Sequence, residues 1–374
     1  MKIMSKLVAR LLDLAIAIQQ TPAPTFHEAE RAGFVRARFE EESLQDVEID
    51  PVGNVYACLK VANDLSSAVR HPLVVSAHLD TVFPANVDLH CERERERILA
   101  PGIGDNSVGV AGLIGLVWML RERGIVLPGE LWLVANVGEE GLGNLRGIKA
   151  IVDRFGSQPL AYLILEGASL GQVYRRGLGV RRYRLSVRTA GGHSWNDYGQ
   201  PSAIHELAAL TTRLTALELP RSPRTTLNVG MIAGGSSVNT IAARSTLELD
   251  LRSEDDQALT ALAEQVEHIV HETEKPGVQV ELEVIGQRPS GELPADHPLV
   301  QLAQDCLRAV GIEPHLNIGS TDATLPLSRG LPAITIGLTT GGRAHSTHEY
   351  IDVAPLEKGM EQLLGLVVGA WDRL

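Results

Sequence analysis

The amino-acid sequence predicts an α/β fold, in which a mostly parallel sheet flanked by helices is interrupted by a smaller inserted domain. One observation is a set of four apolar runs rich in β-branched residues, a composition typical of strands buried on both faces. The runs are PLVVSA (72–77), ELWLVANV (130–137), AYLIL (161–165) and PAITIGL (332–338). The other observation is that a different pattern occupies the long gap between the third run and the fourth.

That gap predicts a ferredoxin-like α+β domain, because its strand and helix patterns follow the order β-α-β-β-α-β. The expected strands are 179–189, 225–233, 245–253 and 278–286, and the expected helices are 201–217 and 255–273. We therefore expect a first catalytic segment over 1–175, an inserted domain over 176–287 and a second catalytic segment over 288–374. The polar stretches LGQVYRRG (170–177) and GQRPSGELP (286–294) are expected to be the hinges.

Composition agrees with a large folded chain. Its 374 residues are 44% hydrophobic and carry a formal charge of −12, which disfavours nucleic acid and anionic membranes as partners. Three distant cysteines indicate no disulfide framework and a reducing, cytoplasmic location. The first 20 residues predict an amphipathic helix rather than a signal peptide, and no run of 18 apolar residues is expected to span a membrane.

Candidate site residues follow the ends of the predicted strands. They are His78, Glu139, Glu140, Glu166 and, in the loop after the fourth run, His345. Asp105 lies in the glycine-rich loop PGIGDN, which opens a helical run over 107–124. Because sites in open α/β sheets form at the carboxyl ends of strands, we expect these side chains to surround one crevice.

Imidazole and carboxylate ligands without cysteine suit a catalytic zinc, manganese or cobalt site. Five ligands exceed the needs of one tetrahedral ion, so the set favours two ions bridged by Asp105. Asp80, two residues after His78, is expected to accept the second ring N–H and fix the tautomer. Within GEE we assign Glu140 as a ligand and Glu139 as the general base.

Together these motifs resemble a known family. HLDTV, GIGDNSVGVAGL, GEEGLG, Glu166, GGHSW and HSTHEYI are similar, in order, to motifs of the two-metal clan MH metallopeptidases. That family includes tripeptidase T, carboxypeptidase G, acetylornithine deacetylase, succinyl-diaminopimelate desuccinylase and the aminoacylases. The resemblance covers nearly the whole chain.

The resemblance implies how the ligands are divided. His78 and Glu166 would bind one metal ion, Glu140 and His345 the other, and Asp105 would bridge the two. Zinc is the first expectation for both ions, with manganese or cobalt as alternatives. The family places its last ligand four residues before a Glu, which selects His345 and leaves His348 as a competing neighbour.

The resemblance also gives the inserted domain the role of a lid and of a homodimer contact. His193 would stabilise the oxyanion in its own or a partner subunit, although the sequence alone favours a locally hydrogen-bonded histidine in a glycine-rich turn. Arg252 would clamp a substrate carboxylate and Asn239 would add a polar contact. For both, an ordinary surface role is the alternative.

The expected reaction is two-metal hydrolysis of amide bonds in short peptides. A metal-bridging water would lose a proton to Glu139, which would pass it to the leaving amine. Glu166 is typical of carboxypeptidase or N-acyl-amino-acid deacylase members, whereas GGHSW (191–195) resembles tripeptidase-like members, so the substrate class stays open. A more distant alternative is a metal-binding homologue without catalysis.

Overall fold

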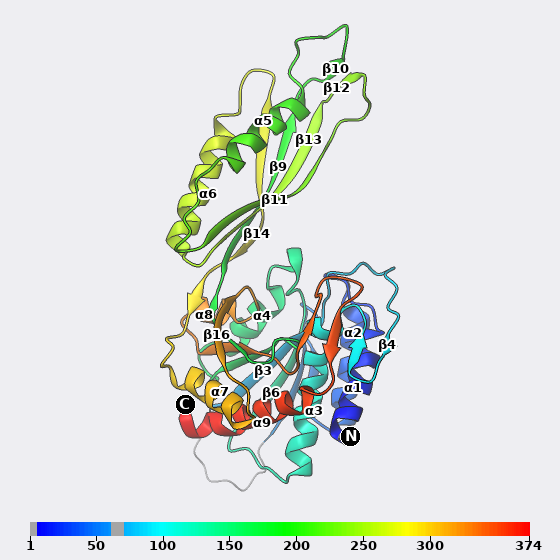
Figure 1. Ribbon diagram of the computed structural model, residues 1–374, viewed down its shortest axis with the longest axis vertical. Coiled ribbons are helices and arrows are strands. Elements are labelled where there is room, and N and C mark those ends of the chain that lie inside the picture. Colours follow the sequence, from blue (N-terminus) through cyan, green and yellow to red (C-terminus); the bar gives the residue numbers. More distant parts are fainter. Residues whose placement is uncertain (1–5, 61–70) are drawn as a thin grey trace. The chain divides into compact units, whose positions relative to one another are not determined.

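The computed structural model describes residues 6–60 and 71–374, which divide into two compact units (Figure 1). Unit 1 comprises Met1–Gly177 and Gly291–Leu374, and unit 2 comprises Leu178–Ser290. The predicted N-terminal helix corresponds to α1 (Lys6–Gln19), and the first five residues of that prediction lie outside the described residues.

The centre of unit 1 is a parallel sheet made from the four apolar runs. In spatial order its strands are β6 (Leu131–Asn136), β3 (Leu73–His78), β7 (Tyr162–Leu165) and β17 (Ala333–Ile336). Each neighbouring pair is parallel and every residue of the four strands is buried. The predicted fold class is therefore confirmed, and the carboxyl ends of these strands share one edge.

Further strands extend this sheet on both sides, mostly in the antiparallel sense. β2 (Val55–Leu59) pairs with β6, and β1 (Gln45–Ile49) pairs with β2. On the other side, β8 (Gln172–Gly177) lies between β17 and β16 (His315–Gly319), and β15 (Gly291–Glu292) also pairs with β8. The expected hinge at 170–177 is wrong, because strand neighbours fix the backbone of this polar segment.

Helices cover the sheet of unit 1. α1 packs on α3 (Val108–Glu122), α3 on α9 (Leu356–Arg373), and α9 on α7 (Pro298–Ala309). α2 (Ala29–Glu41) contacts β1 and β2, while α4 (Arg146–Phe155) contacts α8 (Thr324–Ser328). The segment Ile103–Glu122 is long and apolar enough to cross a membrane, contrary to our expectation, but 94% of its apolar window is buried inside the protein.

A small second sheet brings distant segments of unit 1 together. Its strands, in spatial order, are β18 (Gly341–Gly342), β19 (Tyr350–Asp352), β5 (Arg97–Leu99) and β4 (Glu92–Arg93). β19 pairs with β5 through Tyr350 and Leu99. This pairing places the segment that carries His345 beside the segment that leads into the Asp105 loop.

Unit 2 has the predicted strand and helix order. Its sheet has the order β11 (Thr225–Gly234), β13 (Arg244–Ser253), β9 (Gly179–Arg188) and β14 (Gln279–Arg288), with every pair antiparallel. α5 (Ala203–Thr215) and α6 (Asp256–His271) pack on this sheet and build a separate hydrophobic core. A short pair of strands, β10 (Gly192–His193) and β12 (Thr240–Ile241), carries the GGHSW turn.

Candidate metal centre

The first candidate metal group lies where β3 and β7 end. His78 is the last residue of β3, and its Nε2 lies 3.0 Å from Asp105 Oδ1 and 3.7 Å from Glu166 Oε2. Glu166 follows β7 directly. The ligand atoms of these three residues all lie within 4.8 Å of one another. Two parallel strands and one loop thus direct an imidazole and two carboxylates to a single point.

The second group shares Asp105 with the first. His345 Nε2 lies 3.1 Å from Asp105 Oδ2 and 3.2 Å from Glu140 Oε1, and these three residues also place ligand atoms within 4.8 Å of one another. Asp105 therefore directs one carboxylate oxygen to each histidine. His348 belongs to neither group within the part of the chain that the structure describes.

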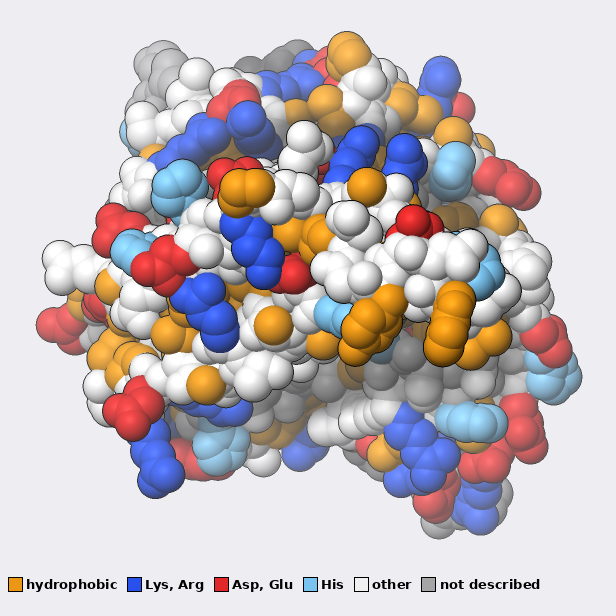
Figure 2. Space-filling view, turned by 90° about the horizontal axis from the view of Figure 1, so that it is seen from above, with side chains coloured by type: hydrophobic (Ala, Val, Ile, Leu, Met, Phe, Trp, Pro, Cys, Tyr) orange, Lys and Arg blue, Asp and Glu red, His pale blue; other side chains and the backbone are white. Residues whose placement is uncertain are grey.

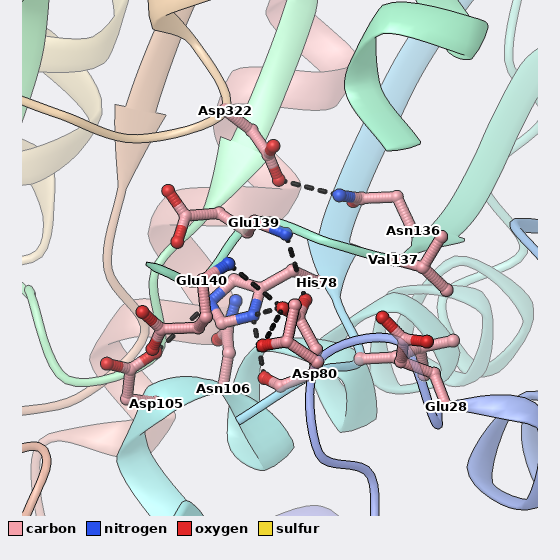
Figure 3. A network of polar contacts seen from close by, with 12 residues as sticks. Glu28, His78, Asp80, Asp105, Asn106, Asn136, Val137, Glu139, Glu140 and Asp322 are labelled. Carbon is pink, nitrogen blue, oxygen red and sulfur yellow. Dashed lines mark hydrogen bonds and ion pairs between the residues drawn. The ribbon is translucent and has the colours of Figure 1, made fainter. Parts of the chain in front are cut away.

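Asp80 is buried at the centre of the polar network in Figure 3. Its carboxylate accepts the backbone N–H of Glu139 at 3.0 Å and that of Glu140 at 2.9 Å, together with the Thr25 hydroxyl at 2.9 Å. His78 Nδ1 lies 3.0 Å from the Asp80 carbonyl oxygen and 3.6 Å from its carboxylate. Asp80 thus holds the GEE segment directly, while its main-chain oxygen is the nearer partner of the ring.

Asn106 joins the carboxyl end of β7 to the Asp105 loop. Its side-chain Nδ2 donates to the Leu165 carbonyl at 2.7 Å, and its Oδ1 accepts the Gly167 N–H at 3.0 Å. The amide therefore binds the residues on both sides of Glu166. Sequence reasoning missed this role, although the position of Asn106 beside Asp105 was a signal for it.

A buried carboxyl group also lies near Glu139. Asp322 Oδ2 accepts a hydrogen bond from Asn136 Nδ2 at 2.7 Å (Figure 3). Burial raises the pKa of Asp322 well above its ordinary value, and the negative charge of Glu139 adds to this effect. No pattern in the sequence had indicated Asp322, because it follows β16, a strand that the apolar runs do not include.

The carboxyl groups of the centre differ in how readily they ionise. Burial, with a smaller contribution from the Asp105 charge, raises the pKa of Glu140 to about 7 and that of Glu166 to about 7. Burial opposes ionisation of Asp105 as well, but its hydrogen bonds to His345 and His78 hold the pKa of that carboxyl below its ordinary value. Hydrogen bonds to Asp105 and Glu140 raise the pKa of His345 to about 10. Burial opposes protonation of His78, but Asp105, Asp80 and Glu166 raise the pKa of that ring well above its ordinary value.

These observations fit a pair of divalent cations. Among the residues that the structure describes, three carboxylates and two imidazoles converge in the two groups, and the pKa values of Glu140 and Glu166 are raised first by burial and then by neighbouring negative charge. Nitrogen and oxygen donors without sulfur match zinc, manganese or cobalt. The residues present therefore suit a two-metal centre, with Asp105 placed to contact both ions.

The three candidate residues of unit 2 fall into two places. His193 on β10 and Asn239 lie together, since Ser194 N donates to the Asn239 carbonyl at 3.1 Å. Arg252 lies at the far end of β13 from Arg244, where it is bound to Asp250 at 2.7 Å. Within unit 2, Arg252 is thus separate from the other two.

His193 is oriented by its own turn. Its Nδ1 accepts the backbone N–H groups of Trp195 at 3.2 Å and Asn196 at 3.3 Å. A neutral ring that accepts at Nδ1 carries its proton at Nε2. The exposed side chain therefore presents an N–H donor.

Fold and centre together define a metal-binding α/β hydrolase. The model of peptidase family M20/M25/M40 matches residues 74–368, and the chain belongs to this family. The family resemblance predicted from the motifs is confirmed. The chain is a hydrolase that acts on peptide or amide bonds.

Individual relatives differ in their named activities. A Mycobacterium tuberculosis protein named as the succinyl-diaminopimelate desuccinylase DapE is 26% identical over 369 residues, which cover 94% of this chain and 96% of the relative. A tripeptidase from Staphylococcus aureus has a TM-score of 0.80 at 20% identity, with 99% of this chain and 100% of that chain covered. A Bacillus subtilis protein described as a dinuclear metal binding peptidase has a TM-score of 0.69 at 17% identity, covering 98% and 99%.

Proposed function

We propose that this protein is a two-metal peptidase that hydrolyses amide bonds in short peptides, with Glu139 as the general base. The observation that carries the proposal is the position of Asp105, whose two carboxylate oxygens lie 3.0 Å from His78 and 3.1 Å from His345. A carboxylate shared between two ligand groups is the arrangement that a pair of bridged ions requires. The description of a similar fold as dinuclear supports the same reading.

Each side chain of the centre then has a role. His78 and Glu166 would hold one ion, Glu140 and His345 would hold the other, and Asp105 would contribute to both groups. When bound, the ions would polarise the substrate carbonyl and lower the pKa of a bound water molecule. We favour zinc, with manganese or cobalt as alternatives.

Glu139 is the carboxylate that we assign to proton transfer. It lies in the loop after β6, immediately before Glu140, and its side chain is buried. Its backbone N–H donates to the Asp80 carboxylate. It accepts the proton of the attacking water and passes it to the leaving amine. Adjacent side chains in an extended segment point in different directions, which allows Glu140 to bind metal while Glu139 faces the water.

The lid residues act on the substrate. His193, with its N–H at Nε2, is suited to stabilise the oxyanion in its own or in a partner subunit. Asn239 would add a polar contact beside it. Arg252 would bind a substrate carboxylate only by giving up part of its contact with Asp250.

An N-acyl-amino-acid deacylase or a carboxypeptidase is the second candidate. The named activity of the mycobacterial relative favours it, because that relative matches almost the whole chain. The resemblance to a tripeptidase fold favours the first candidate. We would assay tripeptides and dipeptides against N-acetyl and N-succinyl amino acids with zinc, manganese or cobalt. Hydrolysis of only the acyl substrates would replace the peptidase assignment, and hydrolysis of neither would refute both.

Replacement of the general base tests the mechanism. Glu139→Gln should retain both Co²⁺ ions and lower kcat by roughly 10²- to 10⁴-fold. Glu42→Gln is the control, because Glu42 is bound to Trp118 and Arg121 rather than to a ligand. Loss of an ion from Glu139→Gln would make Glu139 a ligand. Unchanged metal content with unchanged activity would place the base elsewhere.

We also propose that unit 2 forms a homodimer. β11 is an edge strand of its sheet and exposes Met231 (64%) and Ile232 (61%), and long edge strands pair readily with a second chain. Figure 2 shows exposed hydrophobic side chains among charged ones on the face seen from above. Sedimentation should give a dimer for the wild type and a weaker dimer for Ile232→Lys. A wild-type monomer would refute the proposal.

Three free cysteines favour a cytoplasmic location.

A further inference from the structure

The carboxylate of Glu349 is bound to the backbone of the Asp105 loop. Its side chain is almost fully buried, and its Oε2 accepts the Gly102 N–H at 2.7 Å. Its Oε1 accepts the Gly104 N–H at 2.8 Å and the N–H of Asp105 itself at 2.7 Å. Three main-chain donors thus converge on one acidic side chain that belongs to neither ligand group.

The glycines of this loop make the approach possible. A Cβ on Gly104 would lie 2.9 Å from Glu349 Oε1, and Gly102 adopts a φ of +74°, which disfavours other residues. The spacing Gly-x-Gly-Asp therefore leaves room for a carboxylate beside the backbone. Any side chain at position 104 would push Glu349 away from the Asp105 amide.

The main chain of Glu349 is tied in two directions. Its carbonyl accepts the Ala100 N–H at 2.9 Å, and its own N–H donates to the Ser346 carbonyl at 3.1 Å. His345, next to Ser346, has a φ of 62°, a conformation that non-glycine residues hold only when their surroundings impose it. Glu349 consequently joins the loop that carries Asp105 to the turn that carries His345.

We propose that Glu349 is a positioning residue that holds the shared ligand Asp105 against His345. The inference rests on the proposed two-metal function and adds a residue to it. The three hydrogen bonds, which we call the Glu349 clamp, fix the backbone of Asp105 before any ion binds. Without the clamp, Asp105 would have to be ordered at the cost of metal affinity.

Two substitutions separate this role from simple negative charge. Glu349→Gln keeps the shape but turns an amide N–H₂ towards one of the three N–H donors. Glu349→Asp keeps the charge but shortens the side chain by one methylene, so that it no longer reaches all three. The clamp predicts that both variants lose affinity, whereas a purely electrostatic role predicts loss only for Glu349→Gln.

The test is a Co²⁺ titration of the full chain followed by absorption spectroscopy. Both variants should bind at least one ion roughly 10- to 100-fold more weakly than the wild type and show an altered Co²⁺ spectrum. Glu42→Gln, which also removes a carboxylate bound by several donors, should titrate like the wild type. Wild-type affinity in Glu349→Gln or in Glu349→Asp would overturn the proposal.

If the variants do not fold, hydrogen–deuterium exchange of the wild type tests whether the Glu349 clamp orders the Asp105 loop. In the metal-free wild type, the amides of 102, 104 and 105 should exchange far more slowly than those of the exposed loop 236–238. Equal exchange would overturn the clamp. A wild type that binds no Co²⁺ but protects these amides would refute the two-metal function and leave the hydrogen bonds intact.

Discussion

His345 Nε2 lies 3.1 Å from Asp105 Oδ2, although 240 positions separate the two residues in the sequence. The small sheet of β18, β19, β5 and β4 produces this proximity, because it pairs the segments that flank both residues. The other oxygen of Asp105 faces His78 at 3.0 Å. One side chain therefore controls both ligand groups.

Replacing Asp105 should accordingly remove more metal than replacing either histidine. We expect Asp105→Ala to weaken both ions by roughly 100-fold or more, since each group loses a shared carboxylate. His345→Ala should weaken one ion and leave the group of His78 and Glu166. Elemental analysis after dialysis measures the content. Equal losses in the two variants would mean that the ions do not share Asp105.

Asp80 offers a second test, because its carboxylate accepts backbone N–H groups and belongs to neither candidate metal group among the described residues. Asp80→Asn replaces one acceptor oxygen by a donor beside the N–H groups of Glu139 and Glu140. We expect kcat to fall roughly 10- to 100-fold and the metal-free protein to lose about 2 kcal/mol of unfolding free energy. Thr25→Ser is the matched control, because it keeps the hydroxyl that Asp80 accepts. Wild-type kinetics in Asp80→Asn would contradict this role.

Two helical glycines should respond in opposite ways to alanine. In α9 a Cβ on Gly359 would meet the Leu338 carbonyl oxygen at 1.8 Å, whereas a Cβ on Gly33 in α2 has no neighbour within 4 Å. We expect Gly359→Ala to destabilise by about 1–3 kcal/mol through overpacking. Gly33→Ala should stabilise by about 0.5–1 kcal/mol. Denaturation of the metal-free proteins measures both, and a stabilised Gly359→Ala would show that α9 shifts without cost.

The sequence allowed the central sheet and the candidate ligand groups to be predicted for a physical reason. Strands buried on both faces must be apolar throughout, so β3, β6, β7 and β17 were visible as continuous runs, and the polar residues that follow them were visible as exceptions. β8 was not, because its side chains are only partly buried and its stability comes from strand neighbours distant in sequence.

The contacts that hold the ligands were also hidden from the sequence. In the sequence, Glu349 served only to identify His345 by its spacing. Its own role could not be predicted, because its partners are backbone N–H groups, which every residue except proline possesses. The same holds for Asp80, whose carboxylate binds the main chain of Glu139. A sequence pattern identifies unusual side chains, whereas such contacts depend on where the main chain folds.

Metal binding should become weaker as the pH falls. In the metal-free protein the pKa of Glu140 and that of Glu166 are each raised to about 7, so both carboxyls are largely protonated below that pH. Metal binds the deprotonated groups, and the ion must therefore displace these protons at low pH but not at high pH. Affinity should fall by roughly tenfold or more for each pH unit below 7.

His345 extends this dependence upwards, because its pKa of about 10 keeps the ring protonated at pH 8.5. Binding should therefore still release a proton at pH 8.5 and release more at pH 6. Calorimetric titration with Co²⁺ in two buffers of different ionisation heat counts the protons directly. Equal release at both pH values would mean that Glu140 and Glu166 are already ionised at pH 6, and that burial does not raise their pKa values as the structure indicates.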